Sequence, residues 1–483
     1  MDQQGLMLGI MLTYLTVLMF IGIYVGRKVK SSSDYAISGR NLPGWVAALS
    51  ERATAESAWA LLGLPGAAYA LGLTEMWTAL GCAIGIILSW LFLSQRIRKE
   101  ADKYQADTFM EFIGKRHGRI GKLILITGSL IIAFFFFFYV AAQFIGGGKT
   151  IQEMFGININ AGILIIAVFV IPYTIYGGFR SVAYTDVIQA LLMIITLVIG
   201  PIVGIFFIAN NPDVFATSIP EALQKSGEQY SNLTGLTTGL GAGVVIMTGL
   251  SWMFGYLGGM PQLTIRYMAI RDSAQAKIAR NIAISWTVFA YTGALLIGLL
   301  GIAIFGPASG DLSDVEAVMP AVIFRIFPPL IATILVTGAF AAMISTANSL
   351  LILSSTEISE NIINKSKLRQ KFKLHNLSVS RITTGVLAIA ALVLAYLTKD
   401  MLIYNLVKYA WAGIGDTFSV IIILTLFWKR FHGKAALLTM IIGFVFTVVW
   451  IQTGMEDKYI SCLVLTFVVA LLTAVISTLA IKK

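Results

Sequence analysis

Apolar blocks of roughly 20 residues, almost free of charge, alternate with short polar connections along the whole chain. A helix needs about 20 apolar residues to cross the hydrocarbon core of a bilayer. The pattern therefore predicts an all-α polytopic membrane protein, with a short surface helix in its longest connection, 209–235. The predicted spans, about thirteen, are 6–26, 44–71, 73–95, 123–148, 161–177, 183–208, 236–257, 281–306, 329–356, 379–398, 402–428, 434–454 and 459–480.

Basic residues gather in alternate connections. Lys and Arg concentrate on the cytoplasmic side of membrane proteins, so these clusters predict an outer N-terminus and an inner C-terminus. The first block, 6–26, is too long for the apolar core of a signal peptide and is predicted to be a retained helix. The inner clusters are 27–40, 96–122, Arg180, 266–280, 365–381, 429–434 and Lys482/Lys483, and the outer face holds Asp2, Glu153, Asp213, Glu221, Glu228, Asp311, Asp314, Glu316, Asp400, Glu456 and Asp457.

Composition narrows the class of protein. The chain is 57% hydrophobic and 12% charged, whereas soluble domains carry about 25% charged residues. This excludes a soluble enzyme and a secreted disulfide scaffold. The net charge of +11 is explained by topology rather than by nucleic acid, because the basic residues lie in the short connections. Cys82 and Cys462 both fall in apolar blocks and form no metal-binding pattern.

The second predicted span carries charges at membrane depth. Glu51, Arg52 and Glu56 lie near its middle, among Ser and Thr residues and before a Leu-Pro-Gly sequence. A charge that faces lipid costs about 2.5–3.5 kcal/mol, so these side chains are expected to face protein or a water-filled cavity. Two interpretations remain open: an ion pair between Glu51 and Arg52 that only locks helices together, or a functional site at a weakened helix.

The seventh predicted span, TGLSWMFGYLGGMPQL, contains Gly255, Gly258, Gly259 and Pro261. A helix broken at membrane depth is tolerated where its freed backbone groups line a site. The second and seventh spans each begin a set of five after the leading helix, which indicates an inverted repeat with a site between the halves. The alternative is a kink without function.

Three further spans carry polar groups. In the ninth, Ser345, Asn348 and Ser349 share one helical face beside Thr346, and such hydroxyls suit Na⁺ or helix–helix hydrogen bonds. In the sixth, Asp186 either pairs with Arg180 or completes a second cation site. Asp416 and Lys408 of the eleventh span have no assigned role.

At these residues the chain resembles the sodium:solute symporter family, and within it the bacterial sodium/proline symporters. The resemblance extends over nearly the whole chain. It is carried by DYAISGRNLPGWVAALS, ESAWALLGLPGAAYALGLTEMW, YTIYGGFRSVAYTDVIQALLMI, GLSWMFGYLGG-MPQLTIRYMA, AAMISTANSLL and YAWAGIGDTFSVIIILTLFWKR.

The resemblance implies a LeuT-type fold with two inverted five-helix repeats. It divides one membrane domain, 1–483, into a leading helix at 6–26, a first repeat at 44–208, a second repeat at 236–428 and two further helices at 434–480. It also implies a transporter of the bacterial cytoplasmic membrane that imports a small solute with Na⁺ by alternating access. It implies no other cofactor and no nucleic-acid partner, and it leaves the oligomeric state open, with a monomer as one possibility.

The sodium sites are implied in the same way, one position at a time. The main site would use backbone carbonyls of Ala53, Glu56 and Ala342 with the hydroxyls of Ser345 and Thr346. A second site found in some members would fall on Asp186, Ser345, Asn348 and Ser349, although Asn348 stands where a hydroxyl is usual.

The implied solute site would comprise Ser57, Trp59, Tyr139, Trp252, Tyr256 and Pro261. The chain departs from the proline symporters here, because Glu51, Arg52 and Glu56 place charge on neighbouring positions and one extra residue separates Tyr256 from Pro261. Arg52 is thus expected to bind a solute carboxylate in two-pronged fashion, and Glu51 and Glu56 join the candidate site.

Three hypotheses follow. The first is a sodium-coupled symporter for proline or a related amino acid. The second is the same scaffold with a sugar, sialic acid or organic anion as solute, or with proton coupling through Glu56. The third is a membrane sensor or channel, for which the sequence shows no signalling domain. A membrane enzyme is disfavoured because His117, His375 and His432 all lie in predicted inner connections.

Overall fold

The computed structural model describes residues 3–308, 312, 314–365 and 375–481. All secondary-structure elements among these residues are helices. Several charges used to predict orientation lie outside these residues: Asp2, Asp311, the basic residues of 366–373, Lys482 and Lys483. The prediction of an all-α membrane protein is confirmed. The number of spans and the orientation of the termini stay predictions.

The helices follow one another with short turns. Two of them, α10 and α11, form the surface structure predicted for the 209–235 connection. The α-helices are α1 Gln3–Gly26, α2 Ser32–Ile37, α3 Gly44–Ala58, α4 Leu64–Leu71, α5 Met76–Leu88, α6 Ser94–Tyr104, α7 Phe109–Arg116, α8 Gly121–Phe155, α9 Ile159–Ala209, α10 Ile219–Ser226, α11 Glu228–Ser231, α12 Gly239–Leu250, α13 Trp252–Tyr256, α14 Pro261–Ala269, α15 Ser273–Phe305, α16 Val318–Ile326, α17 Pro329–Ile358, α19 Asn376–Thr398, α20 Ile403–Ala410, α21 Thr417–Phe427, α22 Gly433–Gln452, α23 Met455–Lys458 and α24 Cys462–Ala480.

Short stretches of tighter or wider helix connect several of these elements. Wide π-type turns continue α3, α5, α17 and α20 without a loop, and such turns frequently mark functional sites. The π-helical stretches are η2 Trp59–Gly63, η4 Ser89–Leu93, η7 Ser359–Ile363 and η8 Trp411–Asp416, and the 3₁₀ turns are η1 Ser38–Arg40, η3 Gly72–Glu75, η5 Gly118–Ile120 and η6 Val315–Ala317.

Eleven helical runs in the described chain are long and apolar enough to cross a membrane. Two of them, Gly44–Tyr104 and Ile159–Ala209, hold 61 and 51 residues, and each covers two of the predicted spans. At about 1.5 Å per residue, either run is far longer than a bilayer core of about 30 Å. Each is interrupted at a glycine with positive φ, at +63° in Gly72 and +61° in Gly178, so the chain changes direction there.

The segments before α3 and after α14 pair with each other. The Leu42 amide donates to the Ala269 carbonyl at 3.0 Å, and the Arg271 amide donates to the Leu42 carbonyl at 3.1 Å. The start of α3 is held further by the Gly44 amide, which donates to Oε1 of Gln275 in α15 at 2.7 Å. The two helices that the sequence predicts to be interrupted are therefore anchored side by side.

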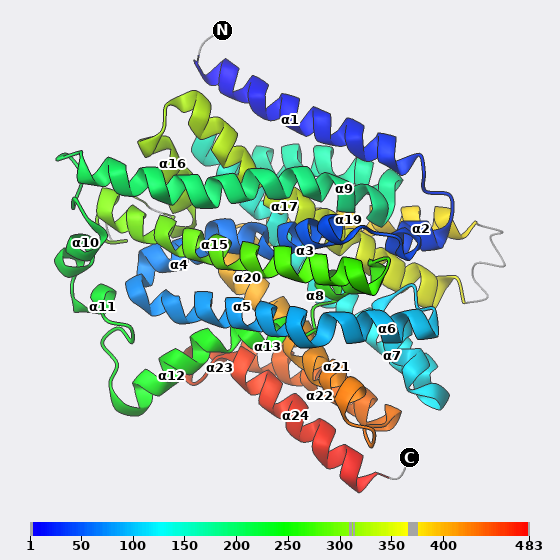
Figure 1. Ribbon diagram of the computed structural model, residues 1–483. Helices are drawn as coiled ribbons and strands as arrows, with labels where there is room; N and C mark the ends of the chain where they lie inside the picture. The colour runs from blue at the N-terminus through cyan, green and yellow to red at the C-terminus, as the bar shows by residue number, and fades with distance from the viewer. Residues whose placement is uncertain (1–2, 309–311, 313, 366–374, 482–483) are drawn as a thin grey trace.

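Helix α17 lies at the centre of the bundle and packs extensively against α8, α9 and α3. Nearly all of it is buried, including a continuous stretch from Leu335 to Glu357. Helices α1 and α24 lie on opposite flanks of the bundle, while α6 and α7 lie at one end and α10 and α11 at the other (Figure 1). We call these the α7 end and the α10 end.

Candidate functional site

Helix α3 is broken at Ser57, where φ is +51° and ψ is −169°. A residue other than glycine in such a conformation costs of order 1–3 kcal/mol. The Ser57 hydroxyl oxygen accepts hydrogen bonds from the Trp59 amide at 3.0 Å and from the Tyr139 hydroxyl at 3.1 Å, and the freed Ala58 amide donates to Oε1 of Gln143 at 2.9 Å. Polar side chains of α8 thus stabilise the break, as expected where backbone groups leave a helix inside a membrane.

The break in α3 faces hydroxyls of α17. The Thr346 hydroxyl donates to the backbone carbonyl of Thr54 at 3.0 Å, and the Thr54 hydroxyl lies 3.0 Å from that of Ser349 and 3.4 Å from that of Ser345. All of these side chains are buried. The structure therefore brings the predicted hydroxyl face of α17 against the weakened end of α3. The other residues predicted for the main sodium site, Ala53, Glu56 and Ala342, are buried on the same two helices.

The second interrupted helix breaks between α13 and α14. Residues 257–260 are not helical, Gly258 has φ +84°, and Pro261 starts α14. A methyl group on Gly259 would lie 1.9 Å from the carbonyl oxygen of Gly415 in η8, so only glycine fits this close backbone approach. The sequence prediction of two interrupted helices agrees with the structure.

An arginine occupies the cluster predicted as a second sodium site. The buried Arg266 of α14 places Nη2 3.1 Å from Asp186 Oδ2, 2.6 Å from the Ser349 hydroxyl and 2.8 Å from the Thr54 hydroxyl. Ser50 joins Asp186 to Arg266, donating to Oδ2 at 2.6 Å and accepting from Nε at 3.0 Å. A guanidinium thus lies where the sequence predicted a cation site.

One expectation for this cluster needs correction. The ion-pair partner of Asp186 is Arg266, so the alternative pairing with Arg180 is wrong. The side-chain amide of Asn348 forms its hydrogen bonds with Tyr173 and Thr174 of α9, the helix that also carries Asp186. The amide is therefore bonded to these two residues rather than directly to the Asp186–Arg266 pair.

Glu51 and Arg52 form a two-pronged ion pair with each other, with Nε–Oε2 and Nη2–Oε1 distances of 2.6 and 2.5 Å. Both side chains are buried. Trp90 Nε1 donates to Glu51 at 3.2 Å, and Arg52 Nη1 donates to the Thr287 hydroxyl at 3.2 Å. The guanidinium fork predicted to face a solute carboxylate is therefore filled by Glu51.

Two buried carboxylates beside the breaks keep oxygens without partners. Glu56 accepts from Trp286 Nε1 at 2.5 Å through Oε1, but its Oε2 has no hydrogen-bond partner among the described residues. Neither oxygen of Asp416 has one. A methyl group on Gly255, at the end of α13, would lie 3.6 Å from Asp416 Oδ1. Each interrupted helix thus has a carboxylate close to its break.

Aromatic side chains fill the space beside Ser57. Trp59 stacks on Trp252 with ring centroids 4.0 Å apart, and Tyr256 lies 4.2 Å from Trp411. Tyr404 packs edge-on against Trp59 at 5.0 Å. The indole N–H groups of Trp59, Trp252 and Trp411 have no partner among the described residues. We call these five residues the aromatic cluster; it unites three predicted solute-site residues with two that the sequence did not single out.

Other residues near the site were also missed by sequence reasoning. Tyr291 of α15 shares a 2.6 Å hydrogen bond with the hydroxyl of Tyr256, and Gln143 and Trp286 bind the break and Glu56. Trp411 lies inside a family-like motif, which was the available signal for it. The other predicted solute residue, Pro261, is buried at the start of α14.

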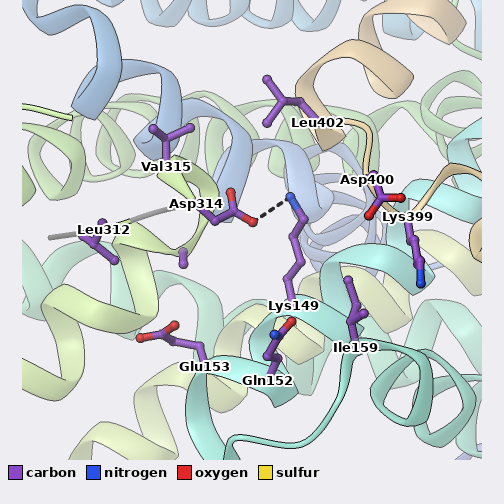
Figure 2. Close-up of a pocket in the computed structure, with 11 residues that line it drawn as sticks. Lys149, Gln152, Glu153, Ile159, Leu312, Asp314, Val315, Lys399, Asp400 and Leu402 are labelled. Carbon is purple, nitrogen blue, oxygen red and sulfur yellow. Dashed lines mark ion pairs between the residues drawn. The ribbon is translucent and has the colours of Figure 1, made fainter. Parts of the chain in front are cut away.

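At the C-terminal end of α8, a cavity of about 710 Å³ opens toward charged side chains (Figure 2). Lys149 forms ion pairs with Asp314 at 2.9 Å and with the buried Glu316 at 2.7 Å. Glu316 also accepts from the amides of Ile403 and Tyr404 at 3.1 and 3.0 Å, which caps α20. These contacts fix the start of the helix that carries Tyr404 to the aromatic cluster.

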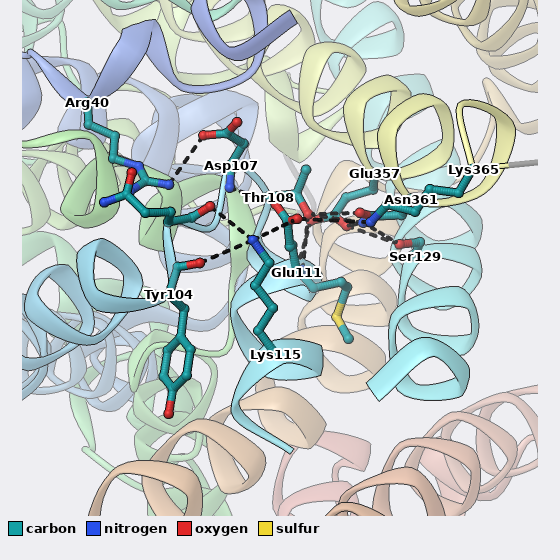
Figure 3. Close-up of polar contacts among 12 residues, drawn as sticks. Arg40, Tyr104, Asp107, Thr108, Glu111, Lys115, Ser129, Glu357, Asn361 and Lys365 are labelled. Carbon is teal, nitrogen blue, oxygen red and sulfur yellow. Dashed lines mark hydrogen bonds and ion pairs between the residues drawn. The ribbon is translucent and has the colours of Figure 1, made fainter. Parts of the chain in front are cut away.

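A second polar network lies at the α7 end (Figure 3). The buried Glu357 accepts hydrogen bonds from the Met110 amide at 3.1 Å, the Ser129 hydroxyl at 3.0 Å and Asn361 Nδ2 at 2.6 Å. Nearby, Arg40 pairs with Asp107 at 3.3 Å. The network ties the end of α17 to α7 and α8, so both ends of the central helices are fastened by polar contacts.

Comparisons with known proteins agree with this arrangement. The family model for the sodium:solute symporter family matches residues 35–443. The osmoregulated proline transporter OpuE of Bacillus subtilis is 32% identical over 97% of this chain and 94% of its own length. The high-affinity proline transporter PutP of the same organism is 32% identical over 91% of each chain.

Solved structures share the fold. A Na⁺-coupled sialic acid symporter in a substrate-bound outward-open state superposes with a TM-score of 0.78 at 19% identity, covering 99% of this chain and 98% of its own. At this identity the likeness establishes the architecture alone, and it confirms the predicted LeuT-type fold.

Proposed function

The chain belongs to the sodium:solute symporter family, and on that premise we propose that it imports proline or a closely related amino acid together with Na⁺. It is a multi-pass transporter of the bacterial cytoplasmic membrane and not an enzyme, as its named relatives are transporters. Na⁺ is the coupling ion of this family. The solute and the residues that bind it are the proposal.

One observation carries the proposal: the hydroxyl of Thr346 meets the Thr54 carbonyl one turn before α3 breaks at Ser57. Carbonyl and hydroxyl oxygens suit a hard monovalent cation. We therefore propose a sodium site between α3 and α17, formed by the carbonyls of Ala53, Glu56 and Ala342 and the hydroxyls of Ser345 and Thr346. In that site, Na⁺ would be coordinated by these carbonyl and hydroxyl oxygens, which lie where α3 and α17 meet.

The proposed solute site lies at the same break in α3, beside the aromatic cluster. We propose that Ser57, Trp59, Tyr139, Trp252, Tyr256 and Pro261 contact an apolar ring through their aromatic faces and its charged groups through their polar atoms. Support comes from the stacked Trp59 and Trp252 beside the Ser57–Tyr139 hydrogen bond. The unpartnered Oε2 of Glu56 suits the ammonium group of a zwitterion. Arg52 would bind a carboxylate only after release from Glu51.

The same geometry argues for one Na⁺ per solute. Arg266 already supplies a positive charge to Asp186, Ser349 and Thr54. A sodium ion bound at Asp186, Ser345, Asn348 and Ser349 would meet that guanidinium at close range, and like charges repel strongly at low dielectric. The amide of Asn348 is also hydrogen-bonded to Tyr173 and Thr174. We propose that the guanidinium replaces the second ion, and that the chain keeps its inverted repeats at 44–208 and 236–428.

Uptake of labelled proline into proteoliposomes tests the function. An inward Na⁺ gradient is expected to drive accumulation above the external concentration, and the ratio of ²²Na⁺ to proline is expected to be one. Accumulation that persists with choline in place of Na⁺ would overturn the coupling. Competition by alanine, sarcosine, sialic acid and glucose then defines the solute class.

A proton-coupled transporter is the second candidate, and the unpartnered oxygen of Glu56 favours it. A buried carboxylate can carry a proton across a conformational change. This candidate requires an inward pH gradient to drive uptake without Na⁺, and it requires Glu56→Gln to abolish that uptake. The same scaffold with a sugar, sialic acid or organic anion as solute is separated by the competition series.

A further inference from the structure

A basic pocket lies at the α7 end, between the end of α7 and the start of α22. The cavity measures about 590 Å³. Three of its lining residues, Arg116, Arg119 and Lys429, are permanent cations, and no Asp or Glu among the described residues lines it. A cavity with this charge attracts an anion. Nothing in the proposed sodium or solute sites uses these residues.

The basic pocket lies at the level where apolar helical runs end. The run that contains α8 begins at Gly118, the run that contains α21 ends at Phe427, and α22 begins at Gly433. The pocket residues at 116–120 and 429–434 lie within two residues of these limits or in the connection between Phe427 and Gly433. The cavity therefore opens at the membrane surface on the predicted cytoplasmic side, where phospholipid headgroups lie.

Two histidines, His117 and His432, also line the pocket. His432 Nδ1 accepts from the Ala435 amide at 3.2 Å, so its Nε2 carries the proton donated to the Ile481 carbonyl at 2.9 Å. Burial, followed by the charge of Arg116, lowers the pKa of His117 to about 4. Gly433 lets the chain pack tightly, since a methyl group there would lie 2.8 Å from Ile120. The positive charge of the pocket thus comes from its arginine and lysine side chains rather than from His117.

Apolar surface continues from the pocket into the bilayer. Leu123 of α8 is 52% exposed, and Ile442 and Val445 of α22 are 39% and 48% exposed. Phe427, at the end of α21, is also exposed and packs under the guanidinium of Arg96 at 4.4 Å. A ligand with an anionic head and acyl chains matches this arrangement, in which apolar surface follows charged surface. A soluble anion would contact only the charged part.

We propose that the basic pocket binds the phosphate headgroup of an anionic phospholipid, with the acyl chains lying along the exposed faces of α8 and α22. Basic pockets between membrane helices on the cytoplasmic side recognise such headgroups. A neighbouring cavity of about 430 Å³ shares Arg116 and adds Arg96, Lys99 and Lys103, together with Glu100. Two basic cavities that meet at one arginine suit a headgroup with two phosphates, so cardiolipin is the preferred ligand.

Lipid binding to the full-length protein in neutral detergent tests the site. Wild-type protein is titrated with cardiolipin, phosphatidylglycerol, phosphatidylcholine and inorganic phosphate, and melting temperature and lipid retention in native mass spectrometry are measured. We expect cardiolipin to raise the melting temperature most, phosphatidylglycerol less, and phosphatidylcholine not at all. An equal rise with phosphatidylcholine, or a full rise with inorganic phosphate alone, would overturn the proposal.

A matched pair of variants locates the effect. Arg119→Gln/Lys429→Gln removes two exposed pocket cations, and Arg27→Gln/Lys28→Gln removes two exposed cations at the end of α1. We expect the first variant to weaken cardiolipin binding about tenfold or more, since each surface cation contributes about 1 kcal/mol. The second should bind like wild type. Equal weakening in both variants would show non-specific attraction and overturn the site.

Discussion

The Thr346 hydroxyl of α17 donates a 3.0 Å hydrogen bond to the backbone carbonyl of Thr54 in α3. This carbonyl lies three residues before the break at Ser57. A side chain nearly 300 positions away along the chain thus contacts the end of α3. This hydrogen bond joins the two predicted repeats. Ion binding at this contact would change how tightly the repeats hold together, which is the physical link between an ion and the solute site beside Ser57.

A substitution in the aromatic cluster should weaken solute binding without changing the sodium dependence of transport. Trp252→Ala removes the ring stacked on Trp59 at 4.0 Å, and the KM for the transported amino acid should rise about tenfold or more, as for loss of a buried aromatic contact. The sodium dependence should be retained. Phe254→Ala is the matched control, because Phe254 is also in α13 but stacks on Phe467 of α24. Equal KM values in the two variants would exclude the cluster from the solute site.

The buried Asp186–Arg266 pair predicts a stability effect. Asp186→Asn or Arg266→Gln alone leaves an uncompensated buried group, which costs about 3–5 kcal/mol. The double variant should lose less than the sum of the two. Thermal unfolding in detergent measures this cycle, and Lys225→Gln in the exposed Glu221 pair should leave the stability almost unchanged. Additive losses would show that the pair is not coupled.

A Glu56 variant distinguishes sodium coupling from proton coupling. In the sodium-coupled account, Glu56→Gln removes the charge opposite the solute ammonium, and KM should rise about tenfold, while a Na⁺ gradient still drives uptake. A pH gradient without Na⁺ should drive none in either protein. Uptake by wild type that follows the pH gradient and disappears in Glu56→Gln would instead establish the proton-coupled candidate.

His117 predicts acid sensitivity. Burial, then the nearby charge of Arg116, lowers its pKa to about 4 in the folded protein, compared with about 6.5 in an unfolded chain. The unfolded state therefore binds the proton more readily. The stability that neutral His117 contributes to the folded protein is complete above about pH 6.5. As pH falls toward 4 it is lost, and the free energy of unfolding drops by at most about 3 kcal/mol.

Melting temperatures between pH 7.5 and 4.5 measure this loss. His117→Gln cannot titrate and keeps a hydrogen-bonding group near the Thr425 hydroxyl, which is 3.0 Å from His117 Nε2. The variant should flatten the pH slope. The exposed His375 provides the control, because His375→Gln should leave the slope as in wild type. An unchanged slope in His117→Gln would assign the acid sensitivity to other groups.

The sequence was sufficient for the features that depend on local pattern. Apolar blocks predict the helices, and glycine and proline predict the interruption after Tyr256. The interruption of α3 was signalled by Ser, Thr and charged residues, although its position at Ser57 depends on Tyr139 and Gln143 of another helix. The juxtaposition of α3 and α17 followed from the family resemblance rather than from either segment alone.

Most partners of buried charges could not be predicted from the sequence. Arg266 looked like one member of a cluster that sets orientation, but its guanidinium reaches Asp186 across 80 residues of chain. The ion pair between Glu51 and Arg52 was one of two interpretations that the sequence left open, and the structure contains it. Adjacent side chains on a helix point in different directions, but these two are long enough to meet. Trp411 and Tyr404 join the aromatic cluster only because α20 and η8 fold over it.

Equilibrium binding of labelled proline to purified protein, measured against Na⁺ concentration, tests the link between ion and solute most directly. The account predicts that proline affinity falls about tenfold or more when choline replaces Na⁺, that Thr346→Val requires about tenfold more Na⁺ for the same affinity, and that Thr346→Ser behaves like wild type. Proline affinity that is the same with and without Na⁺, or a Thr346→Val variant with an unchanged Na⁺ dependence, would contradict it.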